Sequence, residues 1–257
     1  MTSTVIEQPL HSYHLIAQTC LLAGKIILQN GGETYRVEDT MVRIAAAYGI
    51  ADAQSYVTPT GLLFAMDASV PTTRLIRISE RSTNLRKVAL VNDISRRISQ
   101  GKLEVSEAHR LLTEIDEQPF AYPVWLQVLV AAIASGCFLV MFGGRWHDFA
   151  AAVLAGGLGF GSMVLLHRLV PVKLFAEFVA SLLLGGAAIL LVKSGAASNM
   201  DSVIIASVMP LVPGLHITNA VRDLMAGHLV SGLSKGVEAF LTAFAIGAGI
   251  AAALSFY

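Results

Sequence analysis

The chain has 257 residues, no formal net charge and a hydrophobic fraction of 54%. Charged residues make up only 14%, well below the roughly 25% of an ordinary soluble protein, and residues 1–122 hold 12 of the 18 Lys and Arg and 13 of the 18 Asp and Glu. Balanced charge without a basic stripe excludes a nucleic-acid-binding protein, and two cysteines in different halves predict neither a disulfide nor a metal site. We therefore expect a polar N-terminal half joined to a membrane half, with no cofactor.

The first 122 residues predict a small α+β domain at 12–122 after a flexible tail at 1–11. Apolar residues recur at helical spacing in two segments that each end at glycine or Asn-Gly, and three short β-branched segments separated by prolines follow. Two further helical patterns complete the order ααβββαα. The expected helices are 12–30, 33–48, 84–100 and 105–117, and the expected strands of an antiparallel sheet are 54–58, 61–67 and 72–79.

The densest polar cluster of the chain is Gly31-Gly32-Glu33-Thr34-Tyr35-Arg36-Val37-Glu38-Asp39-Thr40. Glu33 and Arg36 are i,i+3 neighbours, and Asp39 and Arg43 are i,i+4 neighbours on the same predicted helix. A solvated helix face with ordinary ion pairs explains this spacing. The cluster contains no nucleophile–base pair and no phosphate loop.

Five apolar runs follow, each near the roughly 20 residues that a helix needs to span a bilayer. The expected transmembrane helices are about 124–142, 149–166, 174–192, 202–221 and 237–256. No Lys or Arg precedes Lys25, so a signal peptide is not expected and the N-terminal half should stay in the cytoplasm. The inner loops 167–173 and 222–236 then hold four basic residues against two in the outer loops, which agrees with the positive-inside rule.

The fourth run is interrupted at 209–216 by two prolines and a glycine. Each proline removes a backbone donor and clashes with the preceding turn, so the helix should break there. Transporters place substrate sites at such breaks because half-helix ends direct their dipoles at the substrate, although a kink that only shapes packing is the alternative. The candidate substrate-binding or gating residues are Pro210, Pro213, Gly214, His216, Asn219, Arg222 and Asp223.

Two carboxylates lie in or beside the apolar runs. Glu177 is about one turn into the third run, and Glu238 is just inside the fifth. A charge at mid-membrane costs about 2.5–3.5 kcal/mol on insertion scales, so such residues usually face a cavity or a partner. Both are candidates for proton coupling, and snorkelling to the interface is the alternative for both.

The polar motifs together resemble the threonine/serine exporter family. The resemblance rests on 31–40, on Val57-Thr58-Pro59-Thr60, and on Pro210-Leu211-Val212-Pro213-Gly214 followed by Arg222-Asp223 and Ser231-Gly232. Single-chain members of that family have about twice as many spans. This chain is therefore similar to the larger subunit of the split, two-component form found in the bacterial inner membrane.

This resemblance, from about residue 12 to the C-terminus, implies a secondary exporter of a small carboxylate metabolite. Succinate or another C4-dicarboxylate is the first expectation and threonine or serine the next, with a smaller integral-membrane subunit supplying the remaining spans and higher oligomers open. With the N-terminus in the cytoplasm, five spans place the C-terminus in the periplasm. The cytoplasmic motif expected to border the entrance consists of Gly32, Glu33, Thr34, Tyr35, Arg36, Glu38 and Asp39.

Two other classes of protein remain open from the residues alone. One is a membrane-anchored cytoplasmic enzyme, which the sequence does not favour because no nucleophile–base or metal constellation is readable. The other is an assembly or regulatory membrane subunit without its own substrate path. We expect a transporter rather than an enzyme.

Overall fold

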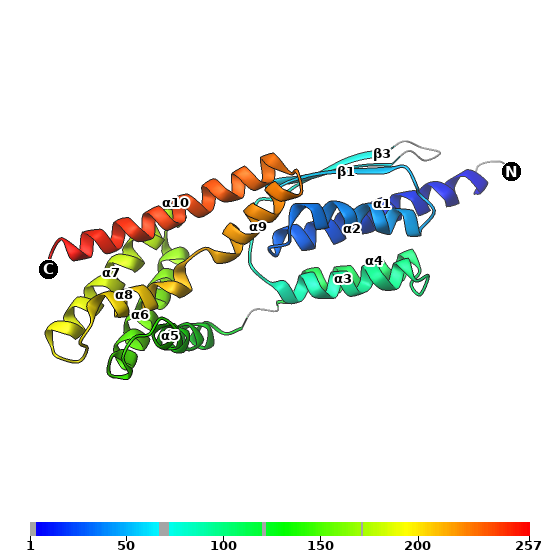
Figure 1. The fold of residues 1–257 in the computed structure, drawn as a ribbon. Helices are drawn as coiled ribbons and strands as arrows, with labels where there is room; N and C mark the ends of the chain where they lie inside the picture. The colour runs from blue at the N-terminus through cyan, green and yellow to red at the C-terminus, as the bar shows by residue number, and fades with distance from the viewer. Residues whose placement is uncertain (1–3, 67–71, 120–121, 171) are drawn as a thin grey trace. The chain divides into compact units, whose positions relative to one another are not determined.

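The computed structural model describes residues 4–66, 72–119, 122–170 and 172–257, and it is mostly helical with one small sheet (Figure 1). The chain forms two compact units. The N-terminal unit comprises Met1–Ala121 together with Leu215–Gly236, and the apolar unit comprises Tyr122–Gly214 together with Val237–Tyr257.

The N-terminal unit has the expected element order ααβββαα. Its first helix begins at Thr4, so residues 4–11, expected as a flexible tail, belong to the helix, where Pro9 removes only one amide near the start. Residues 1–3 of that tail, and Asp67 at the expected end of the second strand, lie outside the described residues. The elements are α1 (Thr4–Gln29), α2 (Thr34–Ala47), β1 (Ala53–Thr58), β2 (Gly61–Met66), β3 (Thr72–Arg77), α3 (Leu85–Ser99) and α4 (Val105–Glu117).

The sheet is antiparallel with strand order β1-β2-β3, and it covers one side of α1 and α2 while α3 and α4 cover the other (Figure 1). Thr58 pairs with Gly61 across a two-residue turn. Side chains alternate along β2, and the inward residues Leu62, Phe64 and Met66 are buried in the core of the unit. The α1–α2 pair is therefore the central layer.

The apolar unit is built from helices that are apolar on nearly all sides. Among the residues that the structure describes, four helices are long and apolar enough to cross a membrane by length and composition: Val124–Met141, Trp146–Leu169, Lys173–Lys193 and Leu229–Leu254. They lie close to four of the expected spans. From residue 122 to the C-terminus the elements are α5 (Val124–Met141), η1 (Trp146–Asp148), α6 (Phe149–Leu169), α7 (Lys173–Lys193), α8 (Met200–Val208), η2 (Met209–Leu211), α9 (Gly214–Met225) and α10 (Leu229–Leu254), of which Leu215–Gly236 belongs to the N-terminal unit.

The fourth expected span is broken where the prolines predict. Helix α8 passes into the 3-10 turn η2, and Val212 is extended (φ −61°, ψ 131°) because the ring of Pro213 disfavours the helical conformation of the preceding residue. The segments on either side, Met200–Leu211 and Gly214–Met225, are bent by 62°. The described residues therefore contain four candidate membrane spans, or five if this bent pair is counted as one span.

The prediction of an inner loop at 222–236 is wrong, because most of these residues are helical. Helix α9 continues to Met225 and α10 already begins at Leu229, so only a short turn remains, with Gly227 at φ +86°. The fifth expected span likewise begins eight residues too late. Because α9 carries polar side chains along one face, it suits a protein surface better than lipid, and from Leu215 onward it belongs to the N-terminal unit.

Candidate functional site

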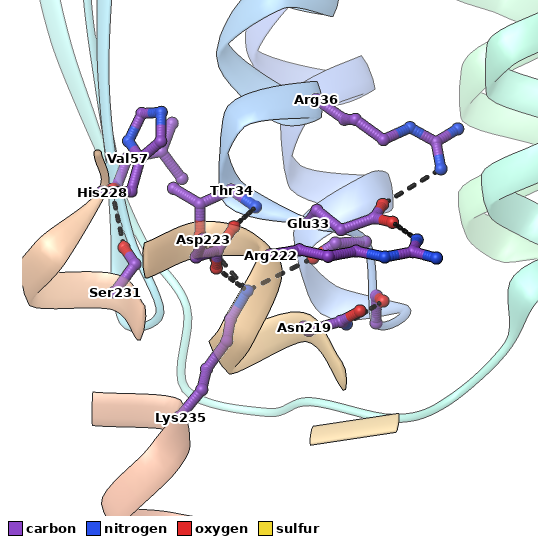
Figure 2. Close-up of polar contacts among 12 residues, drawn as sticks. Glu33, Thr34, Arg36, Val57, Asn219, Arg222, Asp223, His228, Ser231 and Lys235 are labelled. Atoms are coloured by element: carbon purple, nitrogen blue, oxygen red, sulfur yellow. Dashed lines mark hydrogen bonds and ion pairs between the residues drawn. The ribbon is translucent and has the colours of Figure 1, made fainter. Parts of the chain in front are cut away.

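A buried carboxylate from α9 meets the N-terminus of α2. Asp223 is fully buried, and its Oδ1 accepts a hydrogen bond from the Thr34 backbone amide at 2.9 Å while its Oδ2 accepts one from the Thr34 hydroxyl at 2.9 Å (Figure 2). Glu33, the residue at the N-cap of α2, makes no side-chain cap hydrogen bond. Asp223 therefore supplies the negative charge that favours a helix N-terminus, from a distant part of the chain.

The charge of Asp223 is matched by a buried lysine from α10. Lys235 is 6% exposed, and its Nζ donates to Asp223 Oδ2 at 2.7 Å, to the Thr34 hydroxyl at 3.2 Å and to the carbonyl of Gly32 at 3.5 Å. Figure 2 shows the side chain reaching from α10 to this point. An ammonium group has three donors, and all three acceptors are supplied here.

Two arginines flank Glu33 beside this pair. Arg222 of α9 contacts one carboxylate oxygen at 2.6 Å, and Arg36 of α2 contacts the other at 3.0 Å (Figure 2). Burial raises the pKa of Glu33, but hydrogen bonds from its own backbone amide, Arg222 and Arg36, together with the charge of Arg36, outweigh this and hold the pKa below its usual range. The lowered pKa favours the Glu33 carboxylate, which joins α9 to α2.

The N-terminal turn of α10 is tied to the end of β1. The Ser231 hydroxyl donates to the Val57 carbonyl at 3.2 Å, and the Val57 amide donates to Glu38 Oε1 at 2.8 Å. His228 Nε2 lies 3.8 Å from Glu38 Oε2. Burial, reinforced by the charge of Asp223 and opposed by the Val57 and His228 contacts, raises the pKa of Glu38 above its usual range.

The glycine pair after α1 allows this close approach. Gly31 has φ +92°, and its carbonyl accepts a hydrogen bond from the amide of Asn219 at 2.8 Å. A Cβ on Gly32 would lie 2.3 Å from Ile27 Cγ2 and 2.9 Å from the Ile27 carbonyl, so no larger residue fits without movement. We call the set the interhelix network: Gly31, Gly32, Glu33, Thr34, Arg36, Asn219, Arg222, Asp223 and Lys235.

The structure thus brings together three of the seven substrate-site candidates with four of the seven residues of the cytoplasmic motif. Asn219, Arg222 and Asp223 were expected to face a substrate, but here each contacts the 31–34 segment or its flank. His216 lines a cavity of about 30 Å³ that it shares with Asn219 and Lys235, which is room for about one water. This cavity does not hold a dicarboxylate in the present conformation.

The break itself contributes Pro210 in η2, Pro213 just before α9, and Gly214 as the first residue of α9. The Gly214 amide donates to the Val212 carbonyl at 2.8 Å, and Pro213 has no amide hydrogen. Amide groups able to meet a substrate therefore begin with Leu215.

The solvated-face interpretation of the cytoplasmic motif is correct for only part of it. Asp39 and Arg43 form an exposed i,i+4 ion pair, and Tyr35 is 38% exposed, as that interpretation predicts. Glu33 and Thr34, by contrast, are 5% and 0% exposed and are partners of α9.

The two candidates for proton coupling differ in their surroundings. Glu177 of α7 is 3% exposed, and among the described residues no hydrogen-bond partner is found for its Oε2. The buried hydroxyl of Thr242 in α10, also in the apolar unit, is near enough to act on this carboxyl group. Glu238 forms an ion pair with Lys173 at 3.3 Å, partly exposed, so only Glu177 is a buried carboxyl group.

Sequence reasoning missed Lys235, Ser231 and His228 as members of a site. Lys235 was counted only as a loop charge, although it is one of six basic residues in the last 135 positions and stands directly before an apolar run. Basic residues are rare in this part of the chain, and Asp223 stands twelve residues before Lys235. These two facts were the signal that could have predicted an ion pair between them.

Apolar helices of spanning length and a proline-broken segment define an integral membrane protein. The chain belongs to the family described as "Putative threonine/serine exporter" (ThrE), whose model matches residues 18–257. Membership of this family supports a membrane exporter and a transporter role rather than an enzymatic one.

Similar proteins cover this chain almost completely. It is 25% identical over 248 residues to "Probable succinate transporter subunit YjjP" of Klebsiella aerogenes and 26% identical to the protein of that name in Escherichia coli K12, with 94% of each chain covered in both cases. It is 26% identical to "Probable threonine/serine exporter" of Mycobacterium tuberculosis, of which it covers 45%. No solved structure matches the chain.

Proposed function

We propose that this chain is one subunit of a secondary exporter of a small carboxylate metabolite in the bacterial inner membrane. Succinate or another C4-dicarboxylate is the preferred substrate class, because the relatives covered over 94% of their length are named as succinate transporter subunits. Threonine or serine is the second class, after the mycobacterial relative. A smaller integral-membrane subunit completes the transporter, with the N-terminus cytoplasmic and the C-terminus periplasmic.

The observation that carries the proposal is the meeting of two motifs immediately after a proline break. Helix α9 begins at the break and within three turns delivers Asn219, Arg222 and Asp223 to the 31–34 segment. A packing kink alone has no need of a buried Asp–Lys pair behind it, because such a pair costs desolvation energy. A segment that must adopt two positions does need specific contacts that fix one of them.

The substrate carboxylate in this proposal binds at the first turn of α9. The backbone amides of Leu215 and His216 and the positive end of the helix dipole lie at this turn, and both favour an anion. Pro210, Pro213 and Gly214 keep this turn separate from η2. Asn219 contacts the substrate only after its hydrogen bond to Gly31 breaks, and Arg222 only after its ion pair with Glu33 breaks.

The interhelix network is the gate in this proposal. In the present conformation the Asp223–Lys235 pair and the Arg222–Glu33 pair hold α9 and the start of α10 against the N-terminal end of α2. Release of these contacts frees α9 to change its angle at Pro213. Glu177 is the proton-coupling group, because a carboxyl group buried among apolar helices is the one whose protonation a conformational change would alter most.

Counterflow of labelled substrate in proteoliposomes tests the proposal. We expect exchange of succinate with the chain and its partner subunit together, and little with either alone. Pro213→Ala, Gly214→Ala and Asn219→Ala should abolish exchange without affecting membrane insertion. An added Cβ meets nothing within 4 Å at Gly214 or at Gly186, so Gly186→Ala, away from the break, is the matched control. Normal exchange by all three variants would contradict the proposed substrate site. If the wild-type subunits exchange neither succinate nor threonine, the proposal of an exporter is wrong.

A further inference from the structure

A polar hollow lies on the N-terminal unit, away from the interhelix network's lysine. It opens between α2 and α3, has a volume of about 320 Å³, and is within the size range of small-ligand sites. Its lining residues follow one stripe of each helix, at i, i+3, i+4 and i+7 on α2 and at i, i+3 and i+4 on α3. They are Arg36, Asp39, Thr40, Arg43, Asn92, Ser95 and Arg96.

The charge of this hollow is positive. Three arginines face it against a single carboxylate, Asp39, which is paired with Arg43. For Arg96, no hydrogen bond or ion pair of the side chain is found within the ranges that the structure describes. All three arginines are partly exposed beside the apolar seam of α2 and α3, so their guanidinium groups can meet a ligand that enters the hollow from solvent.

Ser95 provides a second, independent indication of a ligand. The residue is 3% exposed, and its hydroxyl has no hydrogen-bond partner within the described part of the chain. A helical serine commonly donates to the carbonyl four residues earlier, as Ser99 does to Ser95. A buried hydroxyl without a partner costs stability, and an alanine at this position would avoid that cost.

We propose that the hollow binds a small multivalent oxyanion, such as a dicarboxylate or a phosphate. Arg43 and Arg96 lie on facing helices and so suit two charged ends or the several oxygens of one tetrahedral group. Ser95 and Asn92 line the same hollow, and their hydroxyl and amide groups supply neutral donors. Guanidinium groups are the donors best matched to carboxylate and phosphate oxygens.

The same ligand reaches the interhelix network through Arg36. This guanidinium lines the hollow and also contacts Glu33, which holds Arg222 of α9. An anion in the hollow competes with Glu33 for Arg36, and Glu33 then depends on Arg222 alone. The hollow is thus placed to report the concentration of a cytoplasmic anion to α9, and its existence does not depend on the proposed export activity.

Isothermal titration of the purified full chain in detergent tests the site. Succinate, inorganic phosphate and acetate are titrated separately at constant ionic strength. We expect one saturable site for a dianion, at least about tenfold weaker binding of acetate, and a similar weakening of dianion binding in Arg96→Gln. Arg97→Gln removes the same charge from the neighbouring position, which does not line the hollow, and should leave the Kd within about twofold.

Ser95→Ala separates binding from folding. The variant should melt at the wild-type temperature or above without ligand, because it loses an unpartnered hydroxyl, and it should bind the dianion more weakly. Tighter binding of phosphate or of succinate identifies the ligand class, and either result supports the site. Absence of dianion binding, or equal losses in Arg96→Gln and Arg97→Gln, overturns it. If Gly214→Ala abolishes dianion binding and Arg96→Gln leaves it intact, the dianion binds at the proline break. That result also overturns the proposed site.

Discussion

The Asp223 carboxylate accepts a hydrogen bond from the backbone amide of Thr34 at 2.9 Å, although 189 residues separate them. A helix usually receives its N-terminal cap from its own sequence, but α2 receives it from α9. The position of α9 is therefore coupled to the stability of α2. Lys235 completes the arrangement because it neutralises the capping charge within the buried site.

Removing that carboxylate should be costly. In Asp223→Ala we expect the free energy of unfolding of the N-terminal unit to fall by about 3–5 kcal/mol, because Lys235 stays buried without its counter-ion. Urea unfolding of the detergent-solubilised chain measures the change. Glu114→Ala breaks the exposed Arg110–Glu114 pair and should change stability by less than about 0.5 kcal/mol. Equal effects of the two substitutions would contradict the structural role of Asp223.

Cys20 offers a local probe for the same unit. Its thiol is fully buried in α1, and burial raises its pKa to about 12, so the reactive thiolate is suppressed at neutral pH. In a Cys137→Ser background, maleimide should modify Cys20 only as the N-terminal unit unfolds. Asp223→Ala should then shift the labelling transition to lower temperature, and rapid labelling of the wild-type fold at 25 °C would contradict the burial of Cys20.

The local structure of this chain was predictable because local rules determine it. Gly31 and Gly49 end their helices at positive φ, and Pro213 keeps Val212 out of the helical region. The partners of α9 were not predictable in this way. Hydropathy placed 202–221 in one span, but Asn219 and Asp223 share a face whose hydrogen-bond partners lie 188 and 189 residues away, and no periodicity reports such a contact.

The Gly32 position should tolerate no side chain. In Gly32→Ala the new Cβ would lie 2.9 Å from the Ile27 carbonyl, and backbone cannot move aside as a flexible side chain can. We expect a loss of about 1–3 kcal/mol in urea unfolding. Gly236→Ala is the matched control in α10: its Cβ meets only Ala220 Cβ at 3.8 Å, and helix propensity should make it neutral or slightly stabilising. A neutral Gly32→Ala would show that the 31–34 segment is not tightly packed.

Glu33 at the N-cap of α2 and the partly buried Glu38 within α2 should give opposite pH dependences. The folded-state pKa of Glu33 lies below its usual 4.5, so the unfolded chain binds more protons in the window below 4.5 and stability falls as the pH falls through it. The folded-state pKa of Glu38 lies above 4.5, so its contribution is lost as the pH rises through that raised value. Thermal melts from pH 3 to pH 7 measure both effects. Glu33→Gln should remove the loss of stability as the pH falls below 4.5, and Glu38→Gln should remove the loss of stability as the pH rises above 4.5. Identical profiles for the two variants would contradict the assignment.

Glu177 should separate proton coupling from substrate movement in the proposed exporter. Its carboxyl group is buried in α7, whereas Glu238 is partly exposed and paired with Lys173 at 3.3 Å. Glu177→Gln keeps the shape and removes the titration, so pH-driven succinate accumulation in proteoliposomes should be lost while counterflow at symmetric pH persists. Glu238→Gln breaks only a partly exposed pair and should retain at least about half of the driven transport. If Glu177→Gln still accumulates succinate against its gradient at the wild-type rate, another group carries the proton, and the buried carboxyl of α7 serves packing alone.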